Sequence, residues 1–192
     1  MIKVFFISSS KNYLVDKKIK SKFLSISKKY NLYFSYNKIL DYKIYLLTKN
    51  KYSKFSKEII VKNEKVPEDR FVKINLEKNI IKIVNDFYGS IPVFYQKNNR
   101  DIYISNLESL ILEVNNYKFS DISLENLFSY LKFGHYVYNE TLWNNVFQML
   151  PDHSYIFELK NDLIKKKYLS TLQASTKKKI IPIVKLLKNY MN

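Results

Sequence analysis

The sequence predicts an α+β fold, and three observations lead to this prediction. Short runs in which apolar and polar residues alternate, the period of β-strands, recur through most of the chain. Between residues 105 and 134 the apolar residues instead recur every three or four positions, as in amphipathic helices. No internal repeat and no low-complexity linker interrupts the 192 residues. We therefore expect antiparallel strands, two helices and further strands within one domain.

The first 69 residues predict strands with one candidate helix. Residues 10–30 are polar and rich in lysine, with scattered Leu, Ile and Phe, and predict a helix or a loop that contains one. Residues 50–69 have the weakest pattern, and a loop is expected through Pro67. Runs of aromatic and β-branched residues predict four strands, at residues 3–8, 31–38, 42–49 and near 58–62.

The pattern is clearest from residue 70, where four short strands are expected to form a meander. The segments 70–86 and 91–105 each contain two apolar runs separated by polar residues. Asp86 ends the first pair, and we interpret it as a turn residue that accepts backbone N–H bonds rather than as a catalytic carboxylate. Gly89, one of two glycines, and Pro92, one of four prolines, lie in the connection to the second pair.

Two amphipathic helices are expected next. Ser105 is suited to cap the first, and Glu108 three residues later completes a capping-box pattern. Asp121 or Ser123 is suited to cap the second, and Gly134 lies just past its end, where a left-handed residue commonly ends a helix. The expected apolar stripes are Leu107, Leu110, Ile111 and Val114 in the first helix, and Leu124, Leu127, Phe128 and Leu131 in the second.

The last third of the chain predicts more strands and a terminal helix. Residues 146–169 predict a loop and two strands separated by a turn. Residues 175–192 predict a helix with Pro182 in its first turn. We expect residues 176–192 to dock a partner, to self-associate, or to fold back onto the domain. The apolar face of this helix would comprise Ile181, Val184, Leu187 and Tyr190.

The chain is strongly basic, with a formal net charge of +16. Only two of its 33 basic residues are arginines, Arg70 and Arg100, although arginine is the preferred residue for bidentate contacts to phosphate and guanine. The lysines are spread along the whole chain, which is typical of the amino-acid usage imposed by an AT-rich genome. We expect no specific nucleic-acid partner, and only weak binding that ignores sequence.

Several other protein classes are disfavoured by what the sequence lacks. No apolar run is long enough to span a bilayer and no secretory signal is recognisable, so the cytoplasm is the expected location. The absence of cysteine excludes disulfides, thiolate metal sites and cysteine nucleophiles. His135 and His153 have no carboxylate at metal-ligand spacing, and no phosphate-binding glycine loop is present.

An ordered set of residues in the second half of the chain resembles a known family. The set comprises Asp86, Gly89, Pro92, Tyr95, Ser105, Gly134, Thr141 and Pro151. Over about residues 70–170 it resembles the N-terminal glutaminase-like domain of the asparagine synthetase family. That family shows an Asp and a Gly, then Pro-Leu-Tyr-Tyr, and later Thr-Leu-aromatic before Leu-Pro-Pro-Gly-His. Here "IPVFY" and "TLWNNVFQMLPDHSYIF" occupy those places. The order of the set, rather than any single motif, carries the resemblance.

The resemblance implies a fold and a division of the chain. Residues 1–170 would form a degenerate four-layer α/β/β/α sandwich of antiparallel sheets, of the N-terminal nucleophile (Ntn) hydrolase type. Residues 171–192 would begin a missing ATP-pyrophosphatase synthetase domain. Gly89 would adopt a backbone conformation that other residues rarely tolerate. Pro92 would start the next strand, where its missing N–H costs the sheet no hydrogen bond.

The chain departs from the family where the chemistry takes place. Active members attack glutamine with a cysteine that becomes residue 1 after Met removal, whereas Ile2 follows Met1 here. No Arg precedes Arg70 and residues 10–70 contain no Gly, so the segments that hold glutamine have no counterpart. No catalytic, cofactor-binding or metal-binding residue is therefore assigned. ATP and Mg²⁺ are expected only with the synthetase domain.

The expected function is that of a non-catalytic, glutaminase-like scaffold domain of an ATP-dependent amide-forming protein. It would be truncated or act with a separate synthetase, and it is similar to the N-terminal domains of β-lactam synthetase-like and lasso-peptide cyclase-like proteins. Two alternatives remain open. One is a glutamine amidohydrolase with a non-standard nucleophile. The other is a basic module that binds nucleic acid or a membrane surface.

Overall fold

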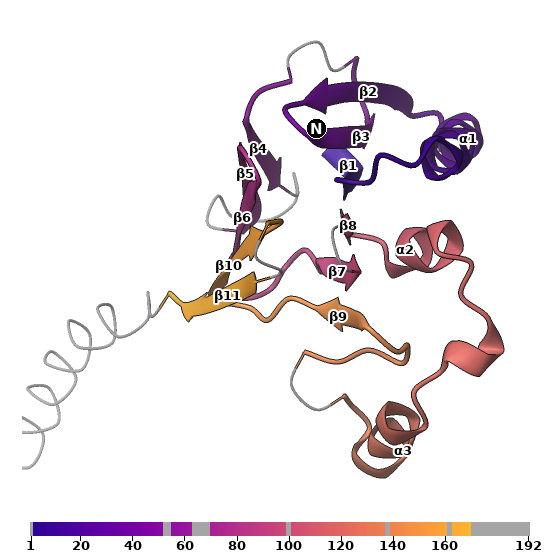
Figure 1. The fold of residues 1–192 in the computed structure, drawn as a ribbon, viewed down its shortest axis with the longest axis vertical. Helices are drawn as coiled ribbons and strands as arrows, with labels where there is room; N and C mark the ends of the chain where they lie inside the picture. Colours follow the sequence, from indigo (N-terminus) through magenta and orange to yellow (C-terminus); the bar gives the residue numbers. More distant parts are fainter. Residues whose placement is uncertain are drawn as a thin grey trace, which may run out of the picture.

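A computed structural model of the chain describes residues 2–51, 55–62, 70–98, 101–136, 139–160 and 163–169. Within these residues, eleven strands form two antiparallel sheets, accompanied by three α-helices (Figure 1). The predicted α+β class is confirmed. The loop expected at Pro67 and the helix expected within residues 171–192 lie outside the described residues.

The first sheet has six strands in the order β2-β3-β1-β8-β7-β9. β1 lies in its interior and pairs with β3 on one side and β8 on the other, so it joins the two halves of the sequence. The strands are β1 (Ile2–Ser8), β2 (Tyr33–Ile39), β3 (Tyr42–Thr48), β7 (Phe94–Asn98), β8 (Asp101–Ser105) and β9 (Val146–Gln148).

The second sheet has five strands in the order β11-β10-β6-β5-β4. β5 and β6 form a hairpin, and Asn79 with a φ of +60° lies in its turn. The expected meander of four strands is wrong, because the chain crosses after β6 to the other sheet, where β7 and β8 pair. The strands are β4 (Glu58–Lys62), β5 (Phe71–Glu77), β6 (Ile80–Asn85), β10 (His153–Glu158) and β11 (Leu163–Tyr168).

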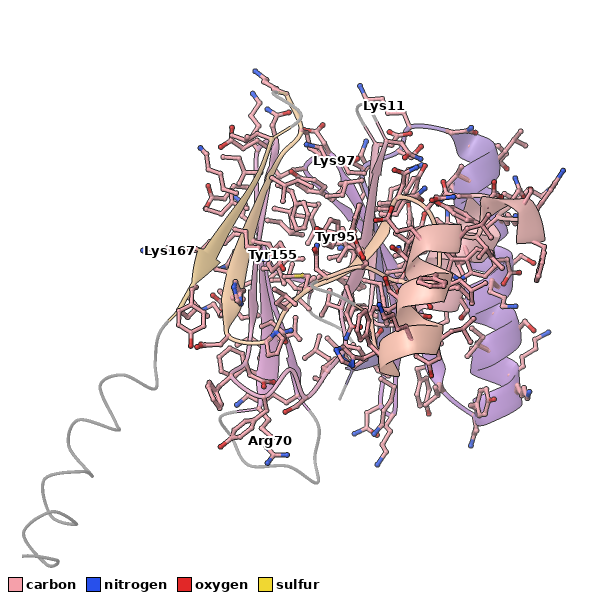
Figure 2. The ribbon with its side chains drawn as sticks, turned by 90° about the horizontal axis from the view of Figure 1, so that it is seen from below. Lys11, Arg70, Tyr95, Lys97, Tyr155 and Lys167 are labelled. Carbon is pink, nitrogen blue, oxygen red and sulfur yellow. The ribbon has the colours of Figure 1, made fainter. Side chains whose placement is uncertain are left out.

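The main hydrophobic core lies between the two sheets. Alternation along each strand directs every second side chain inward, so Phe5 of β1 and Ile74 and Ile83 of the second sheet are fully buried in one cluster. Tyr95 of β7 and Tyr155 of β10 meet between the sheets with ring centroids 5.8 Å apart (Figure 2). The two sheets therefore form a sandwich.

Two helices cover the other face of the six-stranded sheet. α1 (Tyr13–Tyr30) and α2 (Glu108–Val114) pack there through a second cluster that includes Phe23, Tyr45 and Ile111. Figure 2 shows the helices on one side of the molecule and the five-stranded sheet on the opposite side. The outer face of the five-stranded sheet carries exposed side chains such as those of Ile60 and Lys82, and no described helix packs on it.

The predicted capping box of the first amphipathic segment is wrong. α2 begins at Glu108, with Leu107 at its N-cap and no side-chain capping bond. The Ser105 hydroxyl instead accepts the Leu107 N–H at 3.0 Å and donates to the Phe5 carbonyl at 2.8 Å. Ser105 thus joins β8 to β1, a partnership across 100 residues that competes with local capping.

The ends of α3 (Leu124–Phe133) follow the prediction. The Ser123 hydroxyl accepts the Asn126 N–H at 3.2 Å and caps the helix. Gly134 ends it with a φ of +74°, and its N–H donates to the Tyr130 carbonyl at 2.8 Å. Asp121 lies one turn earlier, in the short 3₁₀ helix η1 (Phe119–Asp121).

The predicted apolar stripe of α3 is largely exposed in the described structure. Leu124, Phe128 and Leu131 are 78%, 67% and 74% exposed, and α3 contains no buried residue. The helix is attached at its N-terminal end, through the Ser123 N–H to the Leu142 carbonyl and through an isolated bridge between Ile122 and Trp143. Figure 1 shows α3 beyond β9, at the margin of the molecule.

The connection after β6 differs slightly from the prediction. β7 begins at Phe94 rather than at Ile91, so Pro92 precedes the strand instead of starting it. Ile91 and Val93 are nevertheless buried, and the Val93 carbonyl accepts the Met149 N–H at 2.7 Å. Pro92 has no N–H to donate, which suits this segment outside the regular ladder.

Candidate functional site

The beginning of β1 is the place where the family resemblance would put a nucleophile. Ile2 is buried there, at 5% exposed, beside a small cavity of about 180 Å³. Residues of β1 and β4 and the segment after the Asp86 turn contribute to its wall, Ser90 and Asn106 among them. The site is therefore apolar at its first residue and offers only two uncharged polar side chains.

Both polar side chains of this cavity have structural partners. The Ser90 hydroxyl donates to Asp86 Oδ1 at 3.3 Å. Asn106 accepts the Phe5 N–H through Oδ1 and donates to the Lys3 carbonyl through Nδ2, both at 2.9 Å. Ser90 is the one hydroxyl-bearing residue of the wall, and its hydroxyl is bonded to Asp86, which is itself engaged in a turn. The ionisable side chains of the wall are those of Lys3 and Lys62.

Asp86 organises the turn that follows β6. Its Oδ1 accepts the N–H groups of Tyr88 at 2.8 Å and Ser90 at 3.2 Å, and the side chain is buried. The Gly89 N–H donates to the Asp86 carbonyl at 3.1 Å, and Gly89 has a φ of +60°. This supports the interpretation of Asp86 as a turn residue, because three donors of its own turn occupy one carboxylate oxygen.

The Asp86 turn packs against a second turn 65 residues later in the chain. The Asp152 N–H donates to the Asp86 carbonyl at 2.8 Å, and Asn85 Nδ2 donates to the Leu150 carbonyl at 3.3 Å. A Cβ on Gly89 would lie 3.1 Å from Pro151 Cβ, so the two turns are in close contact. Three of the predicted residues, Asp86, Gly89 and Pro151, therefore form one structural unit, the paired turns.

Sequence reasoning missed Asp152, which is buried within the paired turns. Asp152 has a φ of +55°, a conformation that Asp and Asn tolerate better than most residues. Its position just before His153 is the place where the family motif has glycine, and this was the signal that could have identified it. The backbone of the "LPDH" segment, rather than a reactive side chain, is what the turn requires.

The other predicted residues lie apart from the paired turns. Tyr95 is buried in the core, its hydroxyl accepts Asn139 Nδ2 at 3.1 Å, and burial raises its pKa well above the usual range. The Thr141 hydroxyl donates to the Val146 carbonyl at 2.9 Å and accepts the Trp143 N–H at 3.2 Å, which shapes the approach to β9. Ser105 and Gly134 stand at the ends of other elements, so the eight residues do not converge on one site.

No protein-family model matches this chain, and no curated protein is significantly similar to it.

Asp16, a buried carboxylate with three side-chain partners among the described residues, was not predicted as a site. Asp16 lies on the buried side of α1 and accepts a hydrogen bond from the Tyr45 hydroxyl. Lys20 lies 3.2 Å and Lys43 3.8 Å from its Oδ2. Burial would raise the pKa of Asp16, but the bonds from Tyr45 and Lys20 and the charge of Lys43 outweigh it and lower the pKa. Burial and Asp16 together raise the pKa of Tyr45.

This cluster is suited to pinning α1 onto the sheet rather than to catalysis. A carboxylate that stays ionised next to a phenol that stays protonated has no proton to exchange near neutral pH. A shallow hollow of about 580 Å³ beside it runs along α1 and is lined by lysine, serine and tyrosine side chains. Its one carboxylate is that of Asp16, which is already bound by Tyr45 and Lys20, and Lys17 and Lys28 add positive charge.

The described residues provide neither a metal-ion site nor a membrane-spanning helix. The described part of the chain contains no group of three or more His, Cys, Asp and Glu residues that could hold a metal ion. His135 and His153 each contact a nearby carbonyl, of Phe133 and Pro151 respectively. Among the described helices, none is long and apolar enough to cross a bilayer.

Proposed function

We propose that this chain is a non-catalytic, glutaminase-like scaffold domain of an asparagine synthetase-related protein that forms amide bonds. The observation that carries the proposal is the buried Ile2 at the start of β1, beside a cavity whose one hydroxyl, that of Ser90, is bonded to the Asp86 turn. The two-sheet sandwich and the contact between the Asp86 turn and the Pro151 turn are compatible with the resemblance. A domain with this architecture and without the chemistry would act by holding a partner.

The finer architecture belongs to the same proposal. In an Ntn-hydrolase-like sandwich of four layers, α1 and α2 would form the outer layer on the six-stranded sheet. The outer face of the five-stranded sheet would take the fourth layer, from elsewhere in the protein or from a partner. Ile60 on that face is 43% exposed, which leaves apolar surface for such a contact.

The partner would be an ATP-pyrophosphatase synthetase that adenylates a carboxylate and delivers it to an amine. ATP and Mg²⁺ would bind to that partner, because the described residues of this chain offer no cation site and the sequence has no phosphate-binding glycine loop. The chain's contribution would be to stabilise the synthetase or to shape its substrate entrance.

Two assays test the proposal. Purified chain incubated with glutamine should release ammonia no faster than buffer. A synthetase of this class encoded beside it should form a stable complex with the chain, and substrate-dependent release of AMP and pyrophosphate should fall when the chain is omitted.

Either of two results would contradict the proposal. Glutamine turnover that is lost in Ser90→Ala, the one wall hydroxyl, would establish the amidohydrolase with a non-standard nucleophile. A synthetase that is equally stable and active without the chain would remove the scaffold role. Asn106→Ala is the matched control, because Asn106 lies on the same wall and carries no hydroxyl.

One observation favours a second candidate function, a basic module for polyanionic surfaces. Tyr13 and Leu14 at the start of α1 are both 71% exposed, and Lys17 and Lys28 line the adjacent hollow. Exposed apolar and aromatic groups among lysines are typical of peripheral contact with anionic lipid. Vesicles with and without anionic lipid test this candidate, and equal binding to both would exclude it.

A further inference from the structure

Large apolar side chains of α3 and of the neighbouring η1 are strongly exposed on the described surface. Leu124, Phe128 and Leu131 follow the i, i+4, i+7 spacing of a single helix face. Phe119 in η1, immediately before α3, is 87% exposed. Exposed apolar side chains that gather on one face mark an interaction site rather than ordinary surface. We define the α3 face as Phe119, Leu124, Phe128 and Leu131.

The α3 face is also locally acidic within a basic protein. Residues 119–140 contain Asp121, Glu125 and Glu140 against a single Lys132, whereas the whole chain carries a formal charge of +16. The occupant that complements this surface is therefore an apolar helix with basic flanks. A second copy of α3 fits less well, because it would bring like charges together.

Residues 170–192 have that chemistry. They contain five lysines and no acidic residue. Their apolar residues Ile181, Val184 and Leu187 recur at a spacing that predicts one helix face, with Lys177 to Lys179 directly before it. The segment thus offers an apolar stripe and positive charge. These two properties match the exposed apolar side chains and the acidic residues of the α3 face, which no described segment covers.

This segment leaves the sandwich after β11 and is long enough to cross to the six-stranded sheet, whose strand β9 follows α3 in the chain. The Leu169 N–H donates to the Asp152 carbonyl at 2.9 Å, which fixes the end of β11. β7, which neighbours β9, stacks over β10, which neighbours β11, as the Tyr95–Tyr155 contact shows. Ile181 follows Leu169 by 12 residues. An extended chain of that length spans about 40 Å, against about 10 Å between packed sheets.

We propose that residues 176–192 fold back within the same molecule and bury Ile181, Val184 and Leu187 against the α3 face. The intramolecular arrangement gives the segment a high effective concentration at α3 without any partner. This inference does not depend on the proposed scaffold function. It assigns the terminal segment to the domain itself and leaves the outer face of the five-stranded sheet for a partner.

Disulfide trapping tests the proposal directly, because the chain has no cysteine of its own. Full-length Phe128→Cys combined with Val184→Cys should oxidise to a monomeric disulfide, seen as faster migration on a non-reducing gel. Disulfide formation requires Cα atoms within about 7 Å, so it reports contact. The matched control combines Val184→Cys with Leu14→Cys, since Leu14 is as exposed as Phe128 but lies on α1.

The possible results separate the occupants. A monomeric disulfide with Phe128→Cys and little with Leu14→Cys supports the proposal. Disulfide-linked dimers would show that a second copy occupies the α3 face. Equal trapping at both positions would show that the segment does not bind there specifically, and no trapping at Phe128 would show that it does not bind there at all. Each of these three results overturns the proposal.

Hydrogen exchange gives a readout that needs no cross-link. In full-length Val184→Asp combined with Leu187→Asp, amide exchange in α3 should accelerate about tenfold or more because its cover is lost. Exchange in α1 should not change. Asn189→Asp combined with Asn192→Asp is the control, since it also introduces two aspartates in the segment but keeps both the apolar stripe and the lysines. Unchanged exchange in α3 would overturn the proposal.

Discussion

Single residues stabilise this fold chiefly by fixing turns and by giving buried charges their partners. Gly89 permits a turn that contacts Pro151, and Asp16 ties α1 to Tyr45 in the sheet beneath it. Neither residue needs a reactive role to explain its environment. Substitutions at these positions should therefore change the free energy of unfolding.

Gly89→Val should destabilise the fold by roughly 1 kcal/mol or more, because a β-branched residue is strained at positive φ. The new side chain would also press on Pro151, 3.1 Å from the added Cβ. Gly134→Val is the control, since Gly134 has a similar φ of +74° but no atom within 4 Å of an added Cβ. Urea denaturation of both variants measures the difference. A loss no larger at Gly89 than at Gly134 would show that the Pro151 contact is unimportant.

Asp16→Asn should destabilise the fold at neutral pH by about 1–3 kcal/mol, because the buried Tyr45 hydroxyl would lose a charged acceptor. The lowered pKa of Asp16 sets the pH dependence. Its contribution is present above the unfolded value near 3.9 and is lost as pH falls through the lower, folded value. The variant should thus approach the original protein in stability as the solution is acidified.

Asp41→Asn, an exposed carboxylate on the β2–β3 turn, is the control for that experiment. Denaturation at pH 7 and at stepwise lower pH compares the three proteins. If the gap between Asp16→Asn and the original protein stays constant down to pH 2, the ionised Asp16 is not what stabilises α1.

At the scale of elements, helices α2 and α3 are similar in sequence pattern and different in their attachment. α2 buries Leu110 and Ile111 against the six-stranded sheet, whereas α3 is held at its N-terminal end. The two serines before these helices consequently have different duties. The Ser123 hydroxyl caps α3, whereas the Ser105 hydroxyl links β8 to β1 in the six-stranded sheet.

Ser105→Ala should lower the global unfolding midpoint, because it leaves the buried Phe5 carbonyl without this donor at a cost of about 1–3 kcal/mol. Ser123→Ala should cost about 1 kcal/mol of α3 stability only. Hydrogen exchange would show faster exchange confined to α3 in the second variant and a lower global limit in the first. The opposite assignment would mean that α3 is integral to the core.

The same pair of serines shows what the sequence could and could not predict. Strands were predictable because alternation of apolar residues is a local property, and the end of α3 was predictable because Gly134 and Ser123 act on adjacent residues. Ser105 was assigned wrongly because its partner, Phe5, lies 100 residues away. The exposure of α3 was not predictable either. An apolar stripe in the sequence indicates which face of a helix is apolar, but it does not indicate which segment covers that face. The contact of the two turns was hidden as well, because it joins residues 65 positions apart in the chain.

At the scale of the whole molecule, charge is the dominant property, and it is dispersed. Lysines lie on α1, on the outer face of the five-stranded sheet and on β11, and Figure 2 shows Lys11 and Lys167 on different sides. No pair of arginines is available to recognise a base within the described residues. Charge of this kind attracts polyanions without selecting among them.

Binding to duplex DNA should consequently be weak, insensitive to sequence and steeply dependent on salt. If about six phosphates are neutralised, the association constant should fall roughly a thousandfold between 50 and 200 mM salt. Fluorescence anisotropy with several unrelated duplexes measures both properties. Nanomolar binding of one duplex at physiological salt would contradict this expectation and favour the nucleic-acid module.

The three successive lysines of β11, Lys165 to Lys167, have a consequence for solubility. β11 is the last strand of its sheet in the described residues, so one row of its backbone groups faces outward and could pair with another molecule. Repulsion between lysine-rich edges opposes such sheet-to-sheet addition, in a chain whose residues are 46% hydrophobic. High salt screens that repulsion. Storage at low ionic strength should therefore keep the protein dispersed, and replacing the three lysines by threonine should make it prone to fibrous aggregation.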